Sequence, residues 1–163
     1  IDNLEKKTLK IDYHLAQSAD DCSMSDKALL LAAERASKNS HSPYSKFKVG
    51  AALLLEDGTV IEGSNQENAS FPVGFCAERT ALSAKVAIAP NKKIKAIAIK
   101  VKSELKKVNQ PAAPCGICRQ VLLESEETQK QNIKIILQGE TGPVLIFNSV
   151  KDIVPFYFGA SDF

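Results

Sequence analysis

The stretch FPVGFCAERTAL, residues 71–82, runs from a Pro-Gly loop into a predicted helix over residues 77–87. A second stretch, PCGIC (114–118), opens another predicted helix near Cys115. Each helix is followed by a short apolar run typical of a buried strand, IKAIAIKV (94–101) and IKIILQ (133–138). Helices that alternate with buried strands favour a sheet with helices on its faces. These stretches predict the centre of an α/β fold.

The flanking sequence completes the predicted domain. SDKALLLAAERASKNS (25–40) has an apolar stripe at helical spacing, and Ser25 can cap that helix. Residues 47–65 indicate a hairpin that turns at Asp57-Gly58. The link GETG is too short for a crossover, so PVLIFN (143–148) should return antiparallel, before a helical turn over 149–153.

We therefore expect one three-layer α/β/α domain, residues 25–163, around a mixed five-stranded sheet. Residues 1–24 are polar and weakly patterned and are expected to form an N-terminal extension. The chain has 163 residues, which suits one domain with its own core.

Composition excludes several classes of protein. Hydrophobic residues make up 44% and charged residues 25%, which is typical of a globular chain and not of a disordered one. No apolar run is long enough to cross a bilayer. A net charge of +2, with scattered bases, disfavours nucleic acid as a partner. The N-terminus lacks the apolar core of an export signal, so we expect a cytoplasmic protein.

Cysteines lie at both helix starts, and this pattern predicts a metal site. Cys76 precedes the first helix, and Cys115 and Cys118 open the second. Helix N-termini favour thiolate, and clustered thiolates suit Zn²⁺. Three protein ligands leave one position for water, as in catalytic zinc sites.

The residues after Cys76 fit the same interpretation. Glu78 lies too close in sequence to bind the metal beside Cys76, and an uncoordinated carboxylate there suits a proton shuttle. Three thiolates over Zn²⁺ carry a formal charge of −1. Arg79 and Gln120 are predicted to draw charge from the sulfurs through hydrogen bonds.

Other interpretations of the cysteines stay open. The CxxC pair could be redox-active, although such a pair needs no third cysteine followed by an acid. Cys22 could act as a fourth ligand and close a structural zinc site in a non-catalytic interaction module, or it could be an inert thiol.

Three long motifs carry a family resemblance: YSKFKVGAALL, NQENASFPVGFCAERTAL and PCGICRQVL. They resemble the small cytidine deaminases within the zinc-dependent deaminases, over about residues 25–159. The resemblance implies zinc-dependent hydrolysis of cytidine and 2′-deoxycytidine to uridine and 2′-deoxyuridine, as in pyrimidine salvage. It also implies one Zn²⁺ per subunit on the three cysteines, with Glu78 moving protons.

The same resemblance assigns further roles. Phe47 would pack on the pyrimidine, Asn65 and Glu67 would bind the ribose hydroxyls, and the backbone at Ala77 would read the base. It implies a homotetramer in which sites are completed across subunits, and these shared positions are Tyr44 and Phe158. On sequence alone, Phe47 could be a core residue, and Asn65 and Glu67 could be turn residues. Phe158 could be a residue that anchors the C-terminal tail.

The chain departs from the family pattern at Phe71, which stands where relatives often carry Tyr and lacks the hydroxyl that could contact the sugar. The NxEN and CAERTA stretches favour a plain nucleoside as the substrate. Blasticidin-type antibiotic deaminases share the zinc pattern, so a related cytosine nucleoside is an alternative substrate. Editing of single-stranded nucleic acid is disfavoured by the near-neutral charge.

Overall fold

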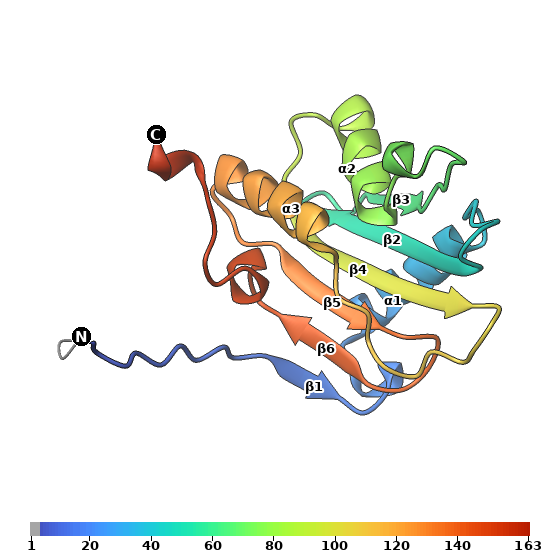
Figure 1. Ribbon diagram of the computed structural model, residues 1–163, viewed down its shortest axis with the longest axis horizontal. Helices are drawn as coiled ribbons and strands as arrows, with labels where there is room; N and C mark the ends of the chain where they lie inside the picture. The colour runs from blue at the N-terminus through green and yellow to red at the C-terminus, as the bar shows by residue number, and fades with distance from the viewer. Residues whose placement is uncertain (1–3) are drawn as a thin grey trace.

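The sheet is centred on β4, a long strand with helices packed against both of its faces (Figure 1). The computed structural model describes residues 4–163. Short 3-10 helices lie at Ala19–Asp21 (η1), Phe71–Val73 (η2), Val150–Ile153 (η3) and Ala160–Asp162 (η4). The remaining elements are β1 (His14–Ala16), α1 (Met24–Ser37), β2 (Phe47–Leu55), β3 (Val60–Ser64), α2 (Ala77–Ile88), β4 (Ile94–Ser103), α3 (Gly116–Gln129), β5 (Lys134–Gln138) and β6 (Val144–Phe147).

The sheet is mixed, with the strand order β1-β6-β5-β4-β2-β3. Only β4 and β5 pair in parallel, and α3 is the crossover that joins them. The other neighbours pair antiparallel, including β6 on β5 as its short link requires. The hairpin turns through Gly58, whose φ of 87° is a conformation that favours glycine. The predicted layers, hairpin, helices and antiparallel return are thereby confirmed.

Small residues let α1 pack closely on one face of the sheet. Ala33 and Ala36 of α1 are buried, and Ala33 packs in one cluster with small residues such as Ala98 of β4. A Cβ on Gly50 of β2 would lie 1.8 Å from the Ala33 carbonyl oxygen. The backbone contact between α1 and β2 therefore requires glycine at this position.

The opposite face carries α2, α3 and the larger hydrophobic cluster. β4 directs Ile97 and Ile99 to this side, where they pack with Leu122 and Leu123 of α3. Gly63 of β3 lies under α2, and a Cβ there would meet the backbone nitrogen of Ala81 at 2.4 Å. This close approach sets the position of α2, which begins directly after Cys76.

The structure corrects two expectations. The sheet has six strands and not five, because His14–Ala16 pairs with β6. Three residues inside a polar stretch give too little pattern to predict a strand. The α1 cap is Ser23 and not Ser25: the Ser23 hydroxyl accepts a hydrogen bond from the Asp26 N–H at 3.1 Å. The division at residue 24 stays a prediction.

Within residues 4–163, no helix combines the length and apolar character that crossing a bilayer requires.

We predict that Gly63→Ala lowers the free energy of unfolding by about 1–3 kcal/mol, because the added methyl overlaps α2 backbone that cannot rotate away. Chemical denaturation would measure this loss. Gly116→Ala is the control, since a Cβ there meets no atom within 4 Å. Equal stability of the two variants would contradict the role given to Gly63.

Candidate metal and substrate site

Two helix starts bring the three predicted cysteines together. Cys76 is the N-cap residue of α2, Cys115 is the N-cap residue of α3, and Cys118 lies in the first turn of α3. The Cys76 and Cys115 Sγ atoms lie 3.9 Å apart, and those of Cys115 and Cys118 lie 3.5 Å apart. All three sulfurs lie within 4.8 Å of one another.

This spacing fits zinc. Four ligands at the usual Zn–S distance of about 2.3 Å place tetrahedral sulfurs about 3.8 Å apart. No fourth ligand atom belongs to the group in the described part of the chain. Cys22 lies away from the three sulfurs: it packs against the hydrophobic residues between α1 and the sheet, and its thiol donates a hydrogen bond to the Ser18 carbonyl. The closed site with Cys22 as a fourth ligand is therefore wrong.

The thiols influence each other's protonation. A hydrogen bond from the Cys118 thiol lowers the pKa of Cys76 to about 6, and nearby Arg79 acts in the same direction. The same contact raises the pKa of Cys118, with burial adding to the effect. The cluster therefore favours the thiolate form at Cys76, and metal binding displaces the protons that the sulfurs still carry.

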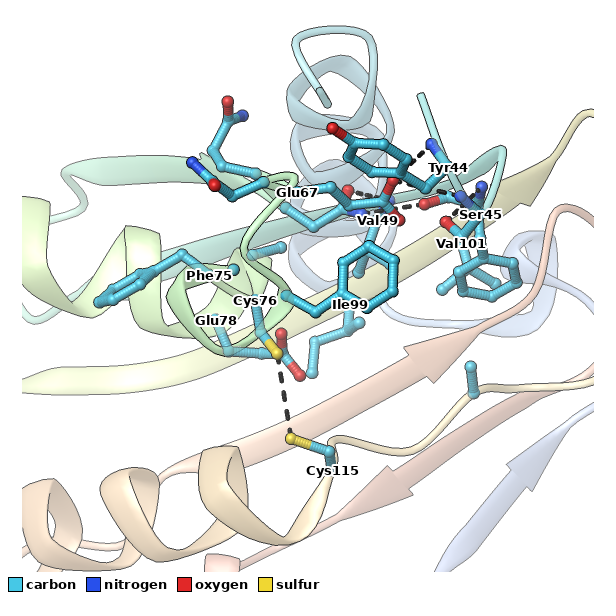
Figure 2. Close-up of a pocket in the computed structure, with 18 of the residues that line it drawn as sticks. Tyr44, Ser45, Val49, Glu67, Phe75, Cys76, Glu78, Ile99, Val101 and Cys115 are labelled. Atoms are coloured by element: carbon cyan, nitrogen blue, oxygen red, sulfur yellow. Dashed lines mark hydrogen bonds between the residues drawn. The ribbon is translucent and has the colours of Figure 1, made fainter. Parts of the chain in front are cut away.

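Glu78 is a buried carboxyl next to the cluster. Its exposed fraction is 4%, and burial raises its pKa above the usual range for glutamate. Figure 2 shows its carboxylate beside the Cys76 sulfur. A raised pKa makes this carboxyl a better proton acceptor, and once protonated it can donate the proton again.

The cluster forms part of the wall of a pocket of about 640 Å³, a volume suited to a small-molecule ligand. Its walls come from β2, β4, the start of α2 and the loops before α2 and α3 (Figure 2). Five of the six predicted substrate residues line it together with Glu78, and these are Tyr44, Phe47, Asn65, Glu67 and Ala77. The apolar side chains in the wall include Tyr44, Phe47, Val49, Phe71, Phe75, Ile99 and Val101.

Loop contacts hold the two predicted ribose ligands. One Glu67 carboxylate oxygen accepts the backbone N–H groups of Tyr44 (2.9 Å) and Ser45 (3.2 Å). The Ser45 hydroxyl, and after it these backbone contacts, lower the pKa of Glu67. The Asn65 side chain bridges β2: its Oδ1 accepts from the Val49 N–H at 2.8 Å, and its Nδ2 donates to the Phe47 carbonyl at 2.9 Å. Asn65 is thus a bracing residue as well as a pocket residue.

The structure also gives the places of the remaining predicted substrate residues. Phe47 opens β2 and is half-buried in the pocket wall, so it belongs to both strand and pocket. Tyr44 packs edge-on against Phe71, with ring centroids 5.6 Å apart. Ala77 is fully buried in the first turn of α2. Phe158 is exposed outside the pocket and contacts Phe163.

The described contacts of Arg79 and Gln120 go to groups other than sulfur. The Arg79 guanidinium lies over the Phe75 ring, 3.9 Å from its centroid. The Gln120 amide donates to the Phe158 carbonyl at 2.9 Å. Their predicted hydrogen bonds to the thiolates stay a prediction.

Comparison with known families and structures matches this site. Residues 23–133 fit the family model described as "Cytidine and deoxycytidylate deaminase zinc-binding region". The chain belongs to this deaminase family. Its three cysteines and their sulfur spacing match the zinc-binding character of the family, and zinc is its cofactor.

Individual members of the family resemble the chain over most of its length. The cytidine deaminase of Halalkalibacterium halodurans is 38% identical over 139 residues, which are 85% of this chain and 98% of the relative. The crystal structure of cytidine deaminase from Burkholderia pseudomallei shares 40% identity and a TM-score of 0.69, covering 80% of this chain and 97% of that one. The Mycobacterium tuberculosis enzyme shares 29% identity and a TM-score of 0.62, covering 81% and 95%.

Two supporting residues of this deaminase were missed in the sequence. Arg119 donates to the carbonyls of Pro114 and Ile153, each at 2.8 Å, and so anchors the loop that carries Cys115. Buried Glu126 accepts the N–H groups of Ile133 and Val150 at 2.8 Å, and so ties α3 to β5 and η3. Both residues lie at ordinary positions in a helical pattern, so the sequence gives no signal for Arg119. For Glu126, the only signal would have been its place among the buried residues of the helix.

We predict that Cys115→Ser reduces bound zinc from one equivalent per chain to less than about a tenth, because two sulfurs and a neutral hydroxyl bind zinc weakly. Metal analysis of the purified, dialysed protein would measure this. Cys22→Ser is the matched control and should retain full zinc content. Loss of zinc in the control as well would contradict the three-cysteine site.

Proposed function

We propose that the chain catalyses hydrolytic deamination of cytidine and 2′-deoxycytidine to uridine and 2′-deoxyuridine, with release of ammonia. The observation that carries the proposal is the buried Glu78 carboxyl beside three clustered sulfurs in the wall of one pocket. Membership of the deaminase family makes the chain a hydrolase of C–N bonds. Uridine and 2′-deoxyuridine are products of pyrimidine salvage. The three thiols must stay reduced to bind metal, and this requirement suits the cytoplasm.

Zinc bound to Cys76, Cys115 and Cys118 would supply a Lewis acid that makes water a stronger nucleophile near neutral pH. Glu78 would accept a proton from the attacking water and deliver it to ring N3. The water oxygen bonds to C4, and Glu78 would then take the second proton from the resulting C4 hydroxyl and pass it to the amine. The C4–N bond breaks, the C4 carbonyl of uridine forms, and the amine leaves as ammonia. The raised pKa of Glu78, caused by burial, suits a group that must both accept and release protons.

The pocket residues would orient the nucleoside. Phe47 offers a face to the pyrimidine ring, and the backbone at Ala77 lies next to the cluster, where the base must sit. One Glu67 carboxylate oxygen is held by the 44–45 backbone, so the other can accept a ribose hydroxyl. Asn65 has one amide N–H beyond its bond to Phe47, and it would donate this to the sugar.

We also infer that Arg79 and Gln120 moderate the negative charge of the zinc-loaded sulfurs, Arg79 through its proximity to Cys76. The chain would assemble as a homotetramer, with Phe158 of one subunit and Tyr44 of another completing a shared site. Exposed Phe156, Phe158 and Tyr44, which leave apolar area uncovered in one chain, support this assembly.

A cytosine nucleoside of the blasticidin type is the alternative substrate. A panel of cytidine, 2′-deoxycytidine, blasticidin S and single-stranded DNA, followed by ultraviolet absorbance, separates the candidates. We expect turnover of the two plain nucleosides only. Faster turnover of blasticidin S, or any turnover of the DNA, would replace the proposed substrate class.

We predict that Glu78→Gln lowers kcat for cytidine by at least about 10³-fold, because the amide can no longer carry a proton at this position. The variant keeps the shape of the site and should retain one zinc per chain, measured on the same sample. Near-normal turnover in the zinc-loaded variant would remove Glu78 from the mechanism.

We predict that Glu67→Gln lowers kcat/KM for cytidine by about 10- to 100-fold, since a hydrogen bond to a charged group is weakened. Steady-state kinetics would show this. Glu62→Gln is the matched control, because Glu62 pairs with Arg35 on the surface and does not line the pocket. If both variants lose the same activity, Glu67 has no specific role in binding the sugar.

A further inference from the structure

The segment that leads into β1 is extended and largely uncovered. Residues 4–12 continue the direction of β1 beyond the end of β6, away from the body of the molecule (Figure 1). They make no backbone hydrogen bond to any other described residue. Strand β1 itself forms one edge of the sheet. We call residues 9–13, with sequence LKIDY, the arm.

The arm has the alternation of a strand with one apolar face. Leu9, Ile11 and Tyr13 alternate with Lys10 and Asp12. The Tyr13 ring packs on Phe147 with centroids 5.6 Å apart, on the side of the sheet that carries α2 and α3. Residues two apart in a strand share a face, so Leu9 and Ile11 extend this apolar row.

This apolar row lacks cover in the single chain. The exposed fractions are 56% for Leu9, 42% for Ile11 and 54% for Tyr13. An edge strand with such a row is a template for pairing with another strand. The arm is therefore suited to a partner that supplies both backbone groups and a matching side-chain pattern.

The arm is complementary to a second copy of itself. When two copies run antiparallel and cross at Ile11, Lys10 of each lies opposite the partner's Asp12, so two opposite-charge pairs form. On the other face, Leu9 lies opposite the partner's Tyr13, and the two Ile11 side chains meet at the twofold axis. Opposed pairs of both kinds stabilise a sheet.

Other registers are poorer. Crossing at Lys10 or at Asp12 sets two like charges against each other, which is unfavourable. Crossing at Leu9 sets Ile11 against the partner's Lys7, and crossing at Tyr13 leaves Leu9 opposite the partner's Gln17. In registers where the twofold axis passes between two residues, apolar residues of one arm lie opposite polar residues of the other throughout.

We propose that the arms of two copies of this chain pair antiparallel across a twofold axis at Ile11, joining their sheets at the β1 edges. The pairing is isologous, because the same surface serves both copies. It uses residues outside the pocket, so it stands apart from the catalytic proposal and from contacts made by the C-terminal segment.

Cysteine cross-linking tests the register. In the zinc-loaded chain, Ile11→Cys sets two thiols face to face, whereas Leu9→Cys, on the same face, leaves its thiols several residues apart and beyond disulfide reach. Under mild oxidation at micromolar concentration, we expect Ile11→Cys to give covalent dimers at least about tenfold faster than Leu9→Cys. The unchanged chain corrects for disulfides through its own cysteines.

Charge exchange tests the pairing itself. In the Ile11→Cys chain, Lys10→Asp sets acid against acid at two symmetric positions and should slow cross-linking about tenfold. Adding Asp12→Lys restores both opposite-charge pairs and should restore the rate. Cytidine turnover, measured alongside, should be the same in all arm variants.

Equal cross-linking at positions 9 and 11, or a double charge exchange that fails to rescue, would overturn the proposal. So would the absence of cross-linking at either position, which would mean that the arm packs on its own chain or on a different partner. None of these outcomes depends on which nucleoside the pocket accepts.

Discussion

The site depends on one constraint: the first turns of α2 and α3 must approach closely enough for three sulfurs to share an ion. Two separate features impose it. Gly63 lets α2 lie directly on β3, and this contact fixes the position of Cys76. Arg119 holds the loop before α3 to the end of η3, and these hydrogen bonds fix the position of Cys115. The pocket, the buried Glu78 and the proposed chemistry all follow from this approach.

The parts of the fold that sequence could predict are those with strong local signals. β4 and β5 are rich in Ile, Ala and Leu at their centres, and α2 and α3 each begin at a cysteine motif. The β2–β3 turn is marked by Asp57-Gly58, and the short link between β5 and β6 leaves only an antiparallel return. β1 was missed because its pairing depends on the edge that β6 offers, which no pattern within three residues can reveal.

The same distinction applies to the site. The metal ligands and Glu78 could be predicted because the chemistry of thiolates and carboxylates limits their use. The double role of Asn65, which braces β2 as it lines the pocket, could not, because the contact spans strands. Arg119 and Glu126 act through backbone groups distant in sequence, and such partners leave no spacing to recognise.

The two helices that carry the cysteines also share an unusual start. Neither Cys76 nor Cys115 accepts a side-chain hydrogen bond from the amides of its own first turn, as a serine or aspartate cap would. Drawing the thiolates together around a cation would fasten both helix ends at once. Zinc supply would then govern how long the chain survives proteolysis in a metal-starved cell, quite apart from its effect on turnover.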